Sequence, residues 1–218
     1  MHPKTLLPIL IILTMPTLLP ADEPLDSANA YIRRGAEHFF ANRIAESIAD
    51  LDKAAELDPK IAPELWQRGI SYYYAGEFKK GREQFESHKT VNPHDVENPA
   101  WHLLCTARQL DSLDKAREFL IKVDTSVDTR EPMKEIYALY AGTGTPDSVL
   151  KRAEDEGTNS AKMYAHLYVA LYYEVTKDEP QAKAHMLQAA AVKLARPSYM
   201  QEVARVHILQ RKWNEEKK

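Results

Sequence analysis

Between residues 28 and 95 the sequence contains one pattern written twice, at a spacing of 34 residues. Glycine occupies the same place in each copy, as Gly35 and Gly69, and proline closes each copy, as Pro59 and Pro93. A short period with one small residue per helix predicts stacked helix pairs, because neither helix of a pair can bury its apolar stripe alone. The period therefore predicts an all-α chain.

The agreement between the copies extends beyond these four positions. The first copy reads Tyr31-x-x-Arg34-Gly35-x-x-His38 and then Ser47-x-x-x-Leu51. The second reads Leu65-x-x-Arg68-Gly69-x-x-Tyr72 and then Gly81-x-x-x-Phe85. This pattern resembles the tetratricopeptide repeat, although arginine replaces the apolar residue before each glycine, and Gly81 stands where alanine is usual. The resemblance implies a right-handed solenoid of antiparallel helix pairs.

The positions that the two copies share have physical roles. The glycines let the second helix of a pair approach the first, and the prolines end the second helix. The repeat demands that Tyr72 and Phe85 lie in the core. The other apolar residues expected around the helix contact are Tyr31, Leu51, Leu57, Leu65 and Val91.

The rest of the chain is divided by its turn and capping signals. Residues 22–30 form an acidic lead-in, with Ser27 or Asn29 as the first N-cap. After the two clear repeats of 28–95, residues 96–160 read as degenerate helical repeats, with a polar break at 124–134. The remaining predicted segments are a helix from Thr145 to Gly157, a final repeat-like pair and capping helix over 161–213 with Pro197 opening the cap, and a charged tail at 214–218.

The first 21 residues differ from the rest. Lys4 precedes an apolar run over 6–13, and a small residue, Ala21, offers a cleavage site before Asp22. This is the pattern of a signal peptide, and it predicts export to the periplasm or the cell exterior. The run is short and interrupted by prolines, which argues against a stable membrane span, although a retained anchor stays an alternative.

Charge and cysteine usage narrow the function further. The chain carries a net charge of −3, and its basic clusters are short and flanked by acids. Nucleic-acid binding is therefore not expected, because phosphate recognition needs a concentrated positive face. With Cys105 as the single cysteine, an internal disulfide is excluded.

The order of parts resembles the NlpI family of bacterial envelope tetratricopeptide proteins. The resemblance covers about residues 28–212, including the pair around Trp101, the short helix 136–140 and the repeat 164–191. It implies a dimerising adaptor that docks envelope enzymes, namely peptidoglycan hydrolases and a processing protease. One departure is that this chain has no cysteine for acylation at the end of its leader.

The first helix of each pair is expected to line the inner face of the solenoid. An apolar stripe at i, i+4, i+7 and i+8 marks that face and offers aromatic anchors to a peptide. The predicted partner-binding residues are Trp66, Ile70, Tyr73, Tyr74, Phe39 and Phe40. The alternatives are that these residues are core, or that the lead-in or a second copy of the chain covers them.

No pattern of catalytic or metal-binding residues stands out. His88 and His94 flank a helix end, and His102 lies three residues from Cys105, but no ligand spacing for zinc is present. We expect packing roles for these residues, no cofactor, no metal and no enzymatic activity.

The sequence thus predicts an exported protein-interaction adaptor that binds protein or peptide partners through its concave aromatic face. One alternative is a structural subunit whose apolar faces build homo-oligomers such as a homodimer. Another is a hydrolase or sugar-binding protein with an unrecognised helical site.

Overall fold

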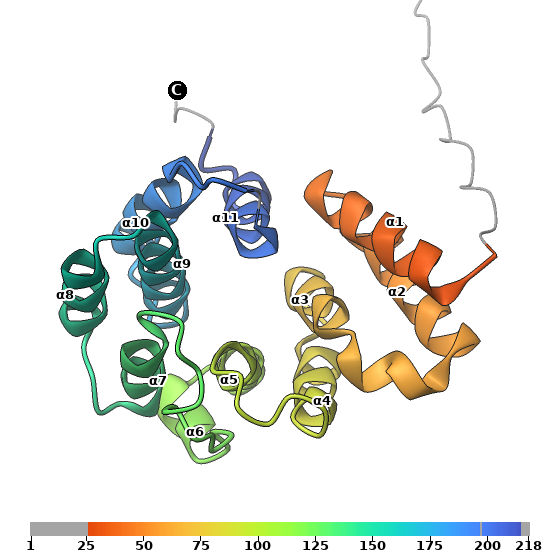
Figure 1. Cartoon of the computed structure of the whole chain (residues 1–218), viewed down its shortest axis with the longest axis horizontal. Helices are drawn as coiled ribbons and strands as arrows, with labels where there is room; N and C mark the ends of the chain where they lie inside the picture. The colour runs from red at the N-terminus through yellow and green to blue at the C-terminus, as the bar shows by residue number, and fades with distance from the viewer. Residues whose placement is uncertain (1–25, 197, 215–218) are drawn as a thin grey trace, which may run out of the picture.

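The structure, a computed structural model, describes residues 26–196 and 198–214. The predicted signal peptide (1–21), the first part of the lead-in (22–25), Pro197 and the last four residues of the tail lie outside these residues. Within the described part of the chain every regular element is helical (Figure 1). The elements are α1 (Ala28–Phe40), α2 (Ile44–Leu57), the 3₁₀ helix η1 (Pro59–Glu64), α3 (Trp66–Tyr74), α4 (Phe78–His88), α5 (Glu97–Leu110), α6 (Leu113–Arg117), α7 (Met133–Ala141), α8 (Pro146–Glu156), α9 (Asn159–Val175), α10 (Glu179–Ala191) and α11 (Tyr199–Gln210).

Consecutive helices pack against one another, among them α1 with α2, α3 with α4 and α9 with α10. In each of these pairs a three-residue turn joins the helices, which makes them antiparallel. The turns contain a residue with positive φ, namely Asn42, Gly76 and Lys177. The left-handed backbone conformation of these residues ends the first helix and reverses the chain direction within a short loop.

The repeat glycines occupy positions of close helix approach, as predicted. A Cβ atom on Gly69 would lie 2.6 Å from Cζ of Phe85, and one on Gly35 would lie 2.9 Å from Cγ of Leu51. Gly81 is equally confined, since an added Cβ would lie 2.8 Å from Sγ of Cys105. The substitution of glycine for the usual alanine at this position therefore makes room for α5.

The unusual arginines of the two repeats join the helices of their own pair. Arg34 on α1 donates two hydrogen bonds of 2.7 Å to the carboxylate of Asp50 on α2. One period later, Arg68 on α3 donates a hydrogen bond of 2.8 Å to Oε1 of Gln84 on α4. Hydrogen bonds between side chains of the two helices thus replace an apolar contact at the same place in both repeats.

The predicted core is largely confirmed, with two exceptions. Tyr72 and Phe85 are buried, as are Tyr31, Leu51 and Leu65. Leu57 and Val91 are instead about half exposed, at 47% and 46%. Both lie at or beyond the end of the second helix of a repeat, where the chain leaves the pair. The second helix of the second repeat, α4, ends earlier than predicted, at His88 rather than at Pro93.

The capping signals of the sequence operate in the structure. The side chain of Ser27 accepts a hydrogen bond from the backbone of Ala30 at the start of α1. Thr145 caps α8, and Gly157 ends it with a φ of 74°. In the degenerate region α6 is short and ends at Arg117.

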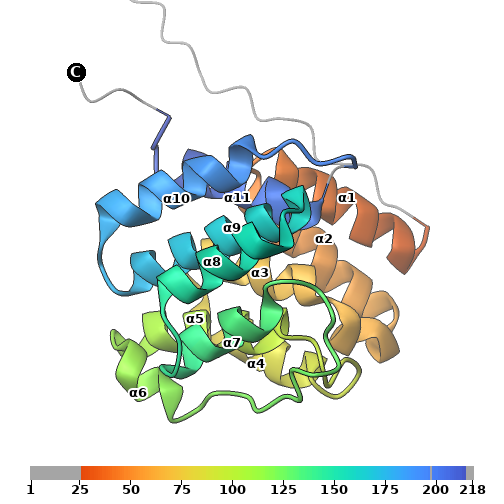
Figure 2. The ribbon, with the colours of Figure 1, turned by 60° about the vertical axis from the view of Figure 1, so that its left-hand side comes forward.

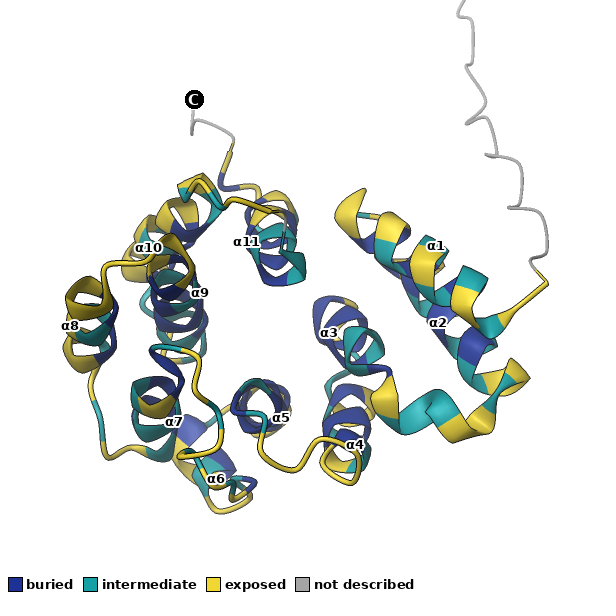
Figure 3. Ribbon diagram, in the orientation of Figure 1, coloured by how far each residue is buried: buried dark blue, intermediate teal, exposed yellow. Residues whose placement is uncertain are grey.

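The helix pairs form a curved array that α11 brings nearly to closure (Figures 1 and 2). One side of α11 packs on α9 and α10, and its other side contacts α1, so the first and last helices meet. Buried residues concentrate on the helix faces that point into this array, and exposed residues on its outer side (Figure 3). No helix in the described part of the chain has the length and hydropathy of a membrane span.

Candidate functional site

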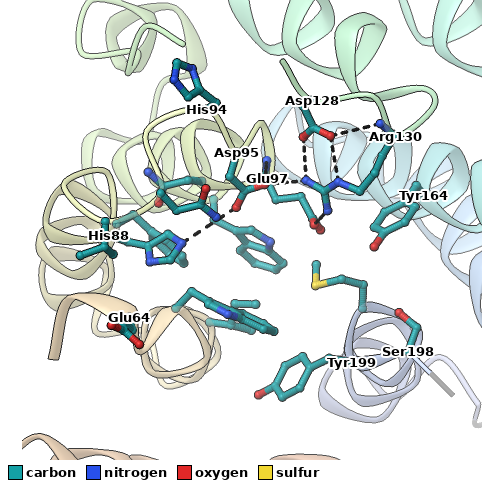
Figure 4. Close-up of a pocket in the computed structure, with 18 of the residues that line it drawn as sticks. Glu64, His88, His94, Asp95, Glu97, Asp128, Arg130, Tyr164, Ser198 and Tyr199 are labelled. Atoms are coloured by element: carbon teal, nitrogen blue, oxygen red, sulfur yellow. Dashed lines mark hydrogen bonds and ion pairs between the residues drawn. The ribbon is translucent and has the colours of Figure 1, made fainter. Parts of the chain in front are cut away.

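A cavity of about 830 Å³ lies on the inner side of the array. Its walls come from α3, the end of α4 with the following turn, the start of α5, the segment 127–130, α9 and the start of α11. Figure 4 shows Asp95 and Glu97 on one side of this cavity and Tyr199 on the opposite side. Segments distant in sequence therefore share one space.

A cluster of four charged residues forms one wall. The guanidinium of Arg130 bonds the carboxylates of Asp95 (2.6 Å), Asp128 (2.7 Å) and Glu97 (Figure 4). The second carboxylate oxygen of Glu97 accepts a hydrogen bond of 2.7 Å from the hydroxyl of Tyr168 on α9. These bonds tie the loop containing Arg130 to α5 and α9.

The pKa values of the cluster reflect burial and the charges of the neighbouring side chains. Burial raises the pKa of Glu97, Asp95 adds to the increase, and Arg130 opposes it. Burial acts in the same direction on Asp128, but its bonds to Arg130 prevail and lower the pKa of that carboxyl. The pKa of Arg130 rises, because its bonds to the surrounding carboxylates outweigh the opposing effect of burial. A single guanidinium thus faces three carboxyl groups.

Aromatic rings form the opposite wall and the floor. The rings of Trp66 on α3 and Tyr199 on α11 meet edge to face, with centroids 4.8 Å apart. Trp101 stacks on Phe85 at 6.4 Å, and the guanidinium of Arg130 lies 5.9 Å from the ring centre of Tyr164. The cavity therefore combines flat apolar surfaces with a negatively charged wall.

Several buried polar atoms at this cavity have no hydrogen-bond partner among the described residues. Asn98 is 2% exposed, yet neither atom of its side-chain amide is bonded. The indole nitrogen of Trp101 and the hydroxyl of Tyr199 are also unbonded. Buried polar groups are nearly always hydrogen-bonded, so this concentration at one cavity marks a place that a ligand or water completes.

His88 contributes a further unbonded atom whose character is defined by its neighbours. Its Nδ1 lies 2.8 Å from the carbonyl oxygen of Pro63, and because a carbonyl only accepts, Nδ1 carries a hydrogen. In the neutral ring Nε2 is therefore an acceptor, and it lies 4.0 Å from Oδ2 of Asp95. Two acceptors face each other at this end of the cavity.

Two exposed valines belong to the residues that line the cavity. Val91 follows α4, and Val127 lies in the segment before Arg130; their exposed fractions are 46% and 52%. Apolar side chains beside a charged and aromatic cavity are a feature of surfaces that dock a ligand or partner.

The predicted partner-binding residues divide into two groups. The exposure predicted for Phe39, Ile70, Tyr73 and Tyr74 is wrong, because these four residues are buried. Trp66 is half-buried and lines the cavity, and Phe40 is 37% exposed. Of the stripe, only Trp66 and Phe40 offer side-chain surface to a partner.

Tyr73 is buried against Phe78 and Trp101, whereas Phe39 and Tyr74 contact α11, which the sequence analysis placed at the end of the array. Tyr199 at its start stacks on Phe39, with ring centroids 5.4 Å apart. Further along, His207 lies 3.0 Å from the hydroxyl of Tyr74. Within the described residues, the chain's own last helix thus contacts Phe39 and Tyr74.

A buried polar network holds α11 in this position. Glu174 on α9 accepts hydrogen bonds from the hydroxyl of Tyr73 (2.7 Å) and from Arg211, directly after α11. Burial acts to raise the pKa of Glu174, but its interactions with His207 and Arg211 lower the pKa below its usual value. The network therefore links α3, α9 and α11 through an ionised carboxylate.

Two of the residues that the sequence analysis considered for chemistry, Cys105 and His102, are buried and contact other parts of the chain. Cys105 is fully buried, burial raises the pKa of its thiol, and Sγ packs against Gly81. The side chain of His102 interacts with Glu86, with 3.2 Å between Nε2 and Oε1. In the described residues, no group of three or more His, Cys, Asp or Glu side chains is arranged to hold a metal ion.

Sequence reasoning missed the charged wall of the cavity. Asp128 and Arg130 lie in the stretch that was interpreted as a polar break, and Asp95 and Glu97 lie between the second and third pairs. Asp95 and Glu97 are more than 30 positions away from Asp128 and Arg130, and no periodicity relates the two pairs. The one local signal is the alternation of acidic and basic residues in Asp128-x-Arg130.

The chain is similar to a known protein over part of its length. Over 84 residues the chain is 27% identical to Protein SGT1 homolog from Bos taurus, which covers 38% of this chain and 25% of that protein. The match thus spans about a quarter of the relative's length. No family model matches the chain. The period of 34, the packed helix pairs and this similarity together support tetratricopeptide-like helical repeats.

Proposed function

We propose that this protein is a protein-interaction adaptor, and that a partner segment docks in the cavity on the inner side of the helix array. The observation that carries the proposal is the cavity itself, which has aromatic walls and unbonded buried polar atoms. Trp66 is the leading anchor, because a half-buried tryptophan in a pocket supplies much of the affinity at protein interfaces. The similarity to the SGT1 homologue supports a protein partner.

The finer parts of the proposal follow from the sequence. We propose a right-handed tetratricopeptide solenoid in which α11 acts as the capping helix. The leader pattern supports export and cleavage near Ala21, followed by action in the periplasm or outside the cell. The resemblance to NlpI-type proteins supports envelope proteases or peptidoglycan hydrolases as the partners.

Site-specific photo-crosslinking tests the docking site. Benzoylphenylalanine is placed in the full-length protein at position 91 or 127, where valine lines the cavity and is exposed. The matched control is position 187 on α10, where Leu187 is exposed to a similar extent, at 40%, but does not line the cavity. Irradiation is performed in cells that express the protein, and the adducts are identified by mass spectrometry.

The adaptor proposal predicts adducts with a different protein at positions 91 and 127 and none at 187. Adducts that contain only the protein itself would instead support the homo-oligomeric subunit. The absence of any protein adduct at 91 and 127, in a folded and expressed protein, would contradict docking at this cavity.

A further inference from the structure

The charged wall of the cavity has an uncompensated negative charge. Asp95, Glu97 and Asp128 surround one guanidinium, that of Arg130. Glu64, which also lines the cavity, is exposed and has no ion-pair partner in the described part of the chain. Four carboxyl groups thus share one fixed cation, so the cavity attracts a positively charged ligand.

Hydrogen-bond acceptors are available for such a ligand. The Oδ1 atom of Asp95 is bonded to Arg130, whereas no described donor bonds its Oδ2. Oδ2 lies 4.0 Å from the acceptor nitrogen of His88, so a nitrogen with two hydrogens can bond both. The ligand group that suits this end of the cavity is therefore a donor of several hydrogen bonds.

The aromatic walls favour a planar cation over a compact one. Trp66, Tyr199 and Tyr164 present rings to the cavity from α3, α11 and α9. A guanidinium stacks on such rings and is less strongly hydrated than an ammonium group, so it loses less on leaving water.

Asn98 indicates that the ligand also contains a peptide bond. Its side-chain amide offers one acceptor and two donors, and both polar atoms are unbonded at the cavity wall. A backbone peptide group has the complementary acceptor and donor, so it can pair with an asparagine amide through two hydrogen bonds. The nearby indole N–H of Trp101 supplies another donor for a carbonyl oxygen.

From these observations we infer that the cavity recognises an arginine side chain within an extended segment of a partner protein. The guanidinium lies between the aromatic rings and bonds Asp95, while Asn98 pairs with the adjoining backbone. This inference rests on the proposed adaptor function and names the chemistry that the same site selects.

Titration of the full-length protein with four probes tests the inference by calorimetry. The probes are acetyl-arginine amide, acetyl-citrulline amide, acetyl-lysine amide and the peptide acetyl-Gly-Gly-Arg-Gly-Gly-amide. Citrulline has nearly the shape of arginine without its charge, so it isolates the contribution of the cation. We expect the arginine probe to bind at least about tenfold more tightly than citrulline, a difference of about 1.4 kcal/mol. The lysine probe should bind more weakly than arginine, and the peptide more tightly.

Variants locate the binding. Glu64→Gln and Asp95→Asn should each weaken arginine binding several-fold, whereas the matched control Glu154→Gln, an exposed carboxylate on α8 that does not line the cavity, should not. Asn98→Leu should weaken the binding of both acetyl-arginine amide and the peptide, because both carry peptide groups beside the arginine. Circular dichroism confirms that each variant is folded.

Three results would overturn the inference. Equal binding of arginine and citrulline would exclude recognition of charge, and no binding of any arginine probe would exclude the site. Equal binding of the peptide and acetyl-arginine amide would exclude recognition of a segment. If protein adducts still formed at positions 91 and 127, the proposed adaptor function would stand even though the arginine inference had failed, because the crosslinking does not depend on arginine.

Discussion

Single residues set the distances between the helices of this protein. Gly69 allows the ring of Phe85 to lie directly against the backbone of α3, and Gly81 does the same for Cys105 of α5. At other positions the residue carries a polar contact through the core, as Arg34 and Glu174 do. Both kinds of residue give predictions that stability measurements can check.

Gly69→Ala should destabilise the protein, although alanine is the better helix former. The added Cβ would lie 2.6 Å from Phe85. The displacement of the ring should cost about 1–3 kcal/mol, more than the gain in helix propensity of roughly 1 kcal/mol. Urea unfolding of Gly69→Ala, Phe85→Leu and the double variant measures the coupling. The alanine should cost much less in the Phe85→Leu background, and equal costs in both backgrounds would exclude the steric explanation.

His207 should make the protein sensitive to acid. Burial lowers its pKa to about 4 in the folded protein, compared with an ordinary value of 6.5. Below pH 6.5 the unfolded chain therefore binds a proton that the folded chain does not, and stability decreases as the pH falls from 6.5 to 4. The loss should reach about 2 kcal/mol at pH 5, and little more should be lost below pH 4.

The comparison that isolates this effect is His207→Asn. Asparagine does not titrate but can still accept a hydrogen bond from Tyr74. The variant should be less stable at pH 7.5 and should lose less stability than the native protein between pH 6.5 and 4. His166, whose pKa burial also lowers to about 4, titrates in both proteins and cancels in the difference. Parallel pH profiles would show that His207 does not control the acid sensitivity.

At the scale of elements, α11 has the largest effect on what the protein presents to a partner. It contacts α1, α9 and α10, and its first residue, Tyr199, contacts Phe39, Phe40 and Trp66. The helix contacts four residues of the aromatic stripe, Phe39, Phe40, Trp66 and Tyr74, and its start lines the cavity. The polar network around Glu174 ties the other end of α11 to the core.

Arg211→Met should loosen α11, because Glu174 would keep its buried charge without the cation. Since Arg211 is about a quarter exposed, the cost should be about 2–3 kcal/mol, below that of a fully buried pair. Hydrogen exchange should show reduced protection in α11. The double variant Arg211→Met/Glu174→Gln should recover part of the stability, whereas a double variant less stable than the single one would refute the role assigned to the ion pair.

For the whole molecule, the meeting of α1 and α11 determines how much apolar surface remains outside the core. Apart from Val91 and Val127, which line the same cavity, the exposed large apolar residues occur on separate elements, for example Phe40 on α1, Phe119 after α6 and Leu187 on α10. Scattered single residues do not form a stable dimer interface, which needs a continuous surface.

The protein should therefore sediment as a monomer across about a hundredfold range of concentration near micromolar, because four of the six stripe residues that a second copy would need are buried. Analytical ultracentrifugation of residues 22–218 measures the mass at each concentration. As a control, Phe40→Ala should sediment identically. A mass that increases with concentration, and that Phe40→Ala reduces, would support the homo-oligomeric alternative.

The sequence by itself determined the helical class, the pairing of helices in the two clear repeats and the roles of Gly35, Gly69, Tyr72 and Phe85. These features are local or periodic: a glycine at a fixed spacing, or a cap beside a helix, acts within its own pair. The turns were less accessible, because Lys177 occupies a left-handed position that side chains rarely adopt.

The tertiary structure decided what covers the inner face and where the cavity lies. The contacts that bury Tyr73 and Tyr74 come from Glu174 and His207, about 100 or more positions away. The charged wall likewise joins Asp95 to Arg130 across a stretch with no repeat signature. Because the array curves until its ends meet, the contacts of α11 depend on the summed rotation of the helix pairs, which no single stretch of sequence encodes.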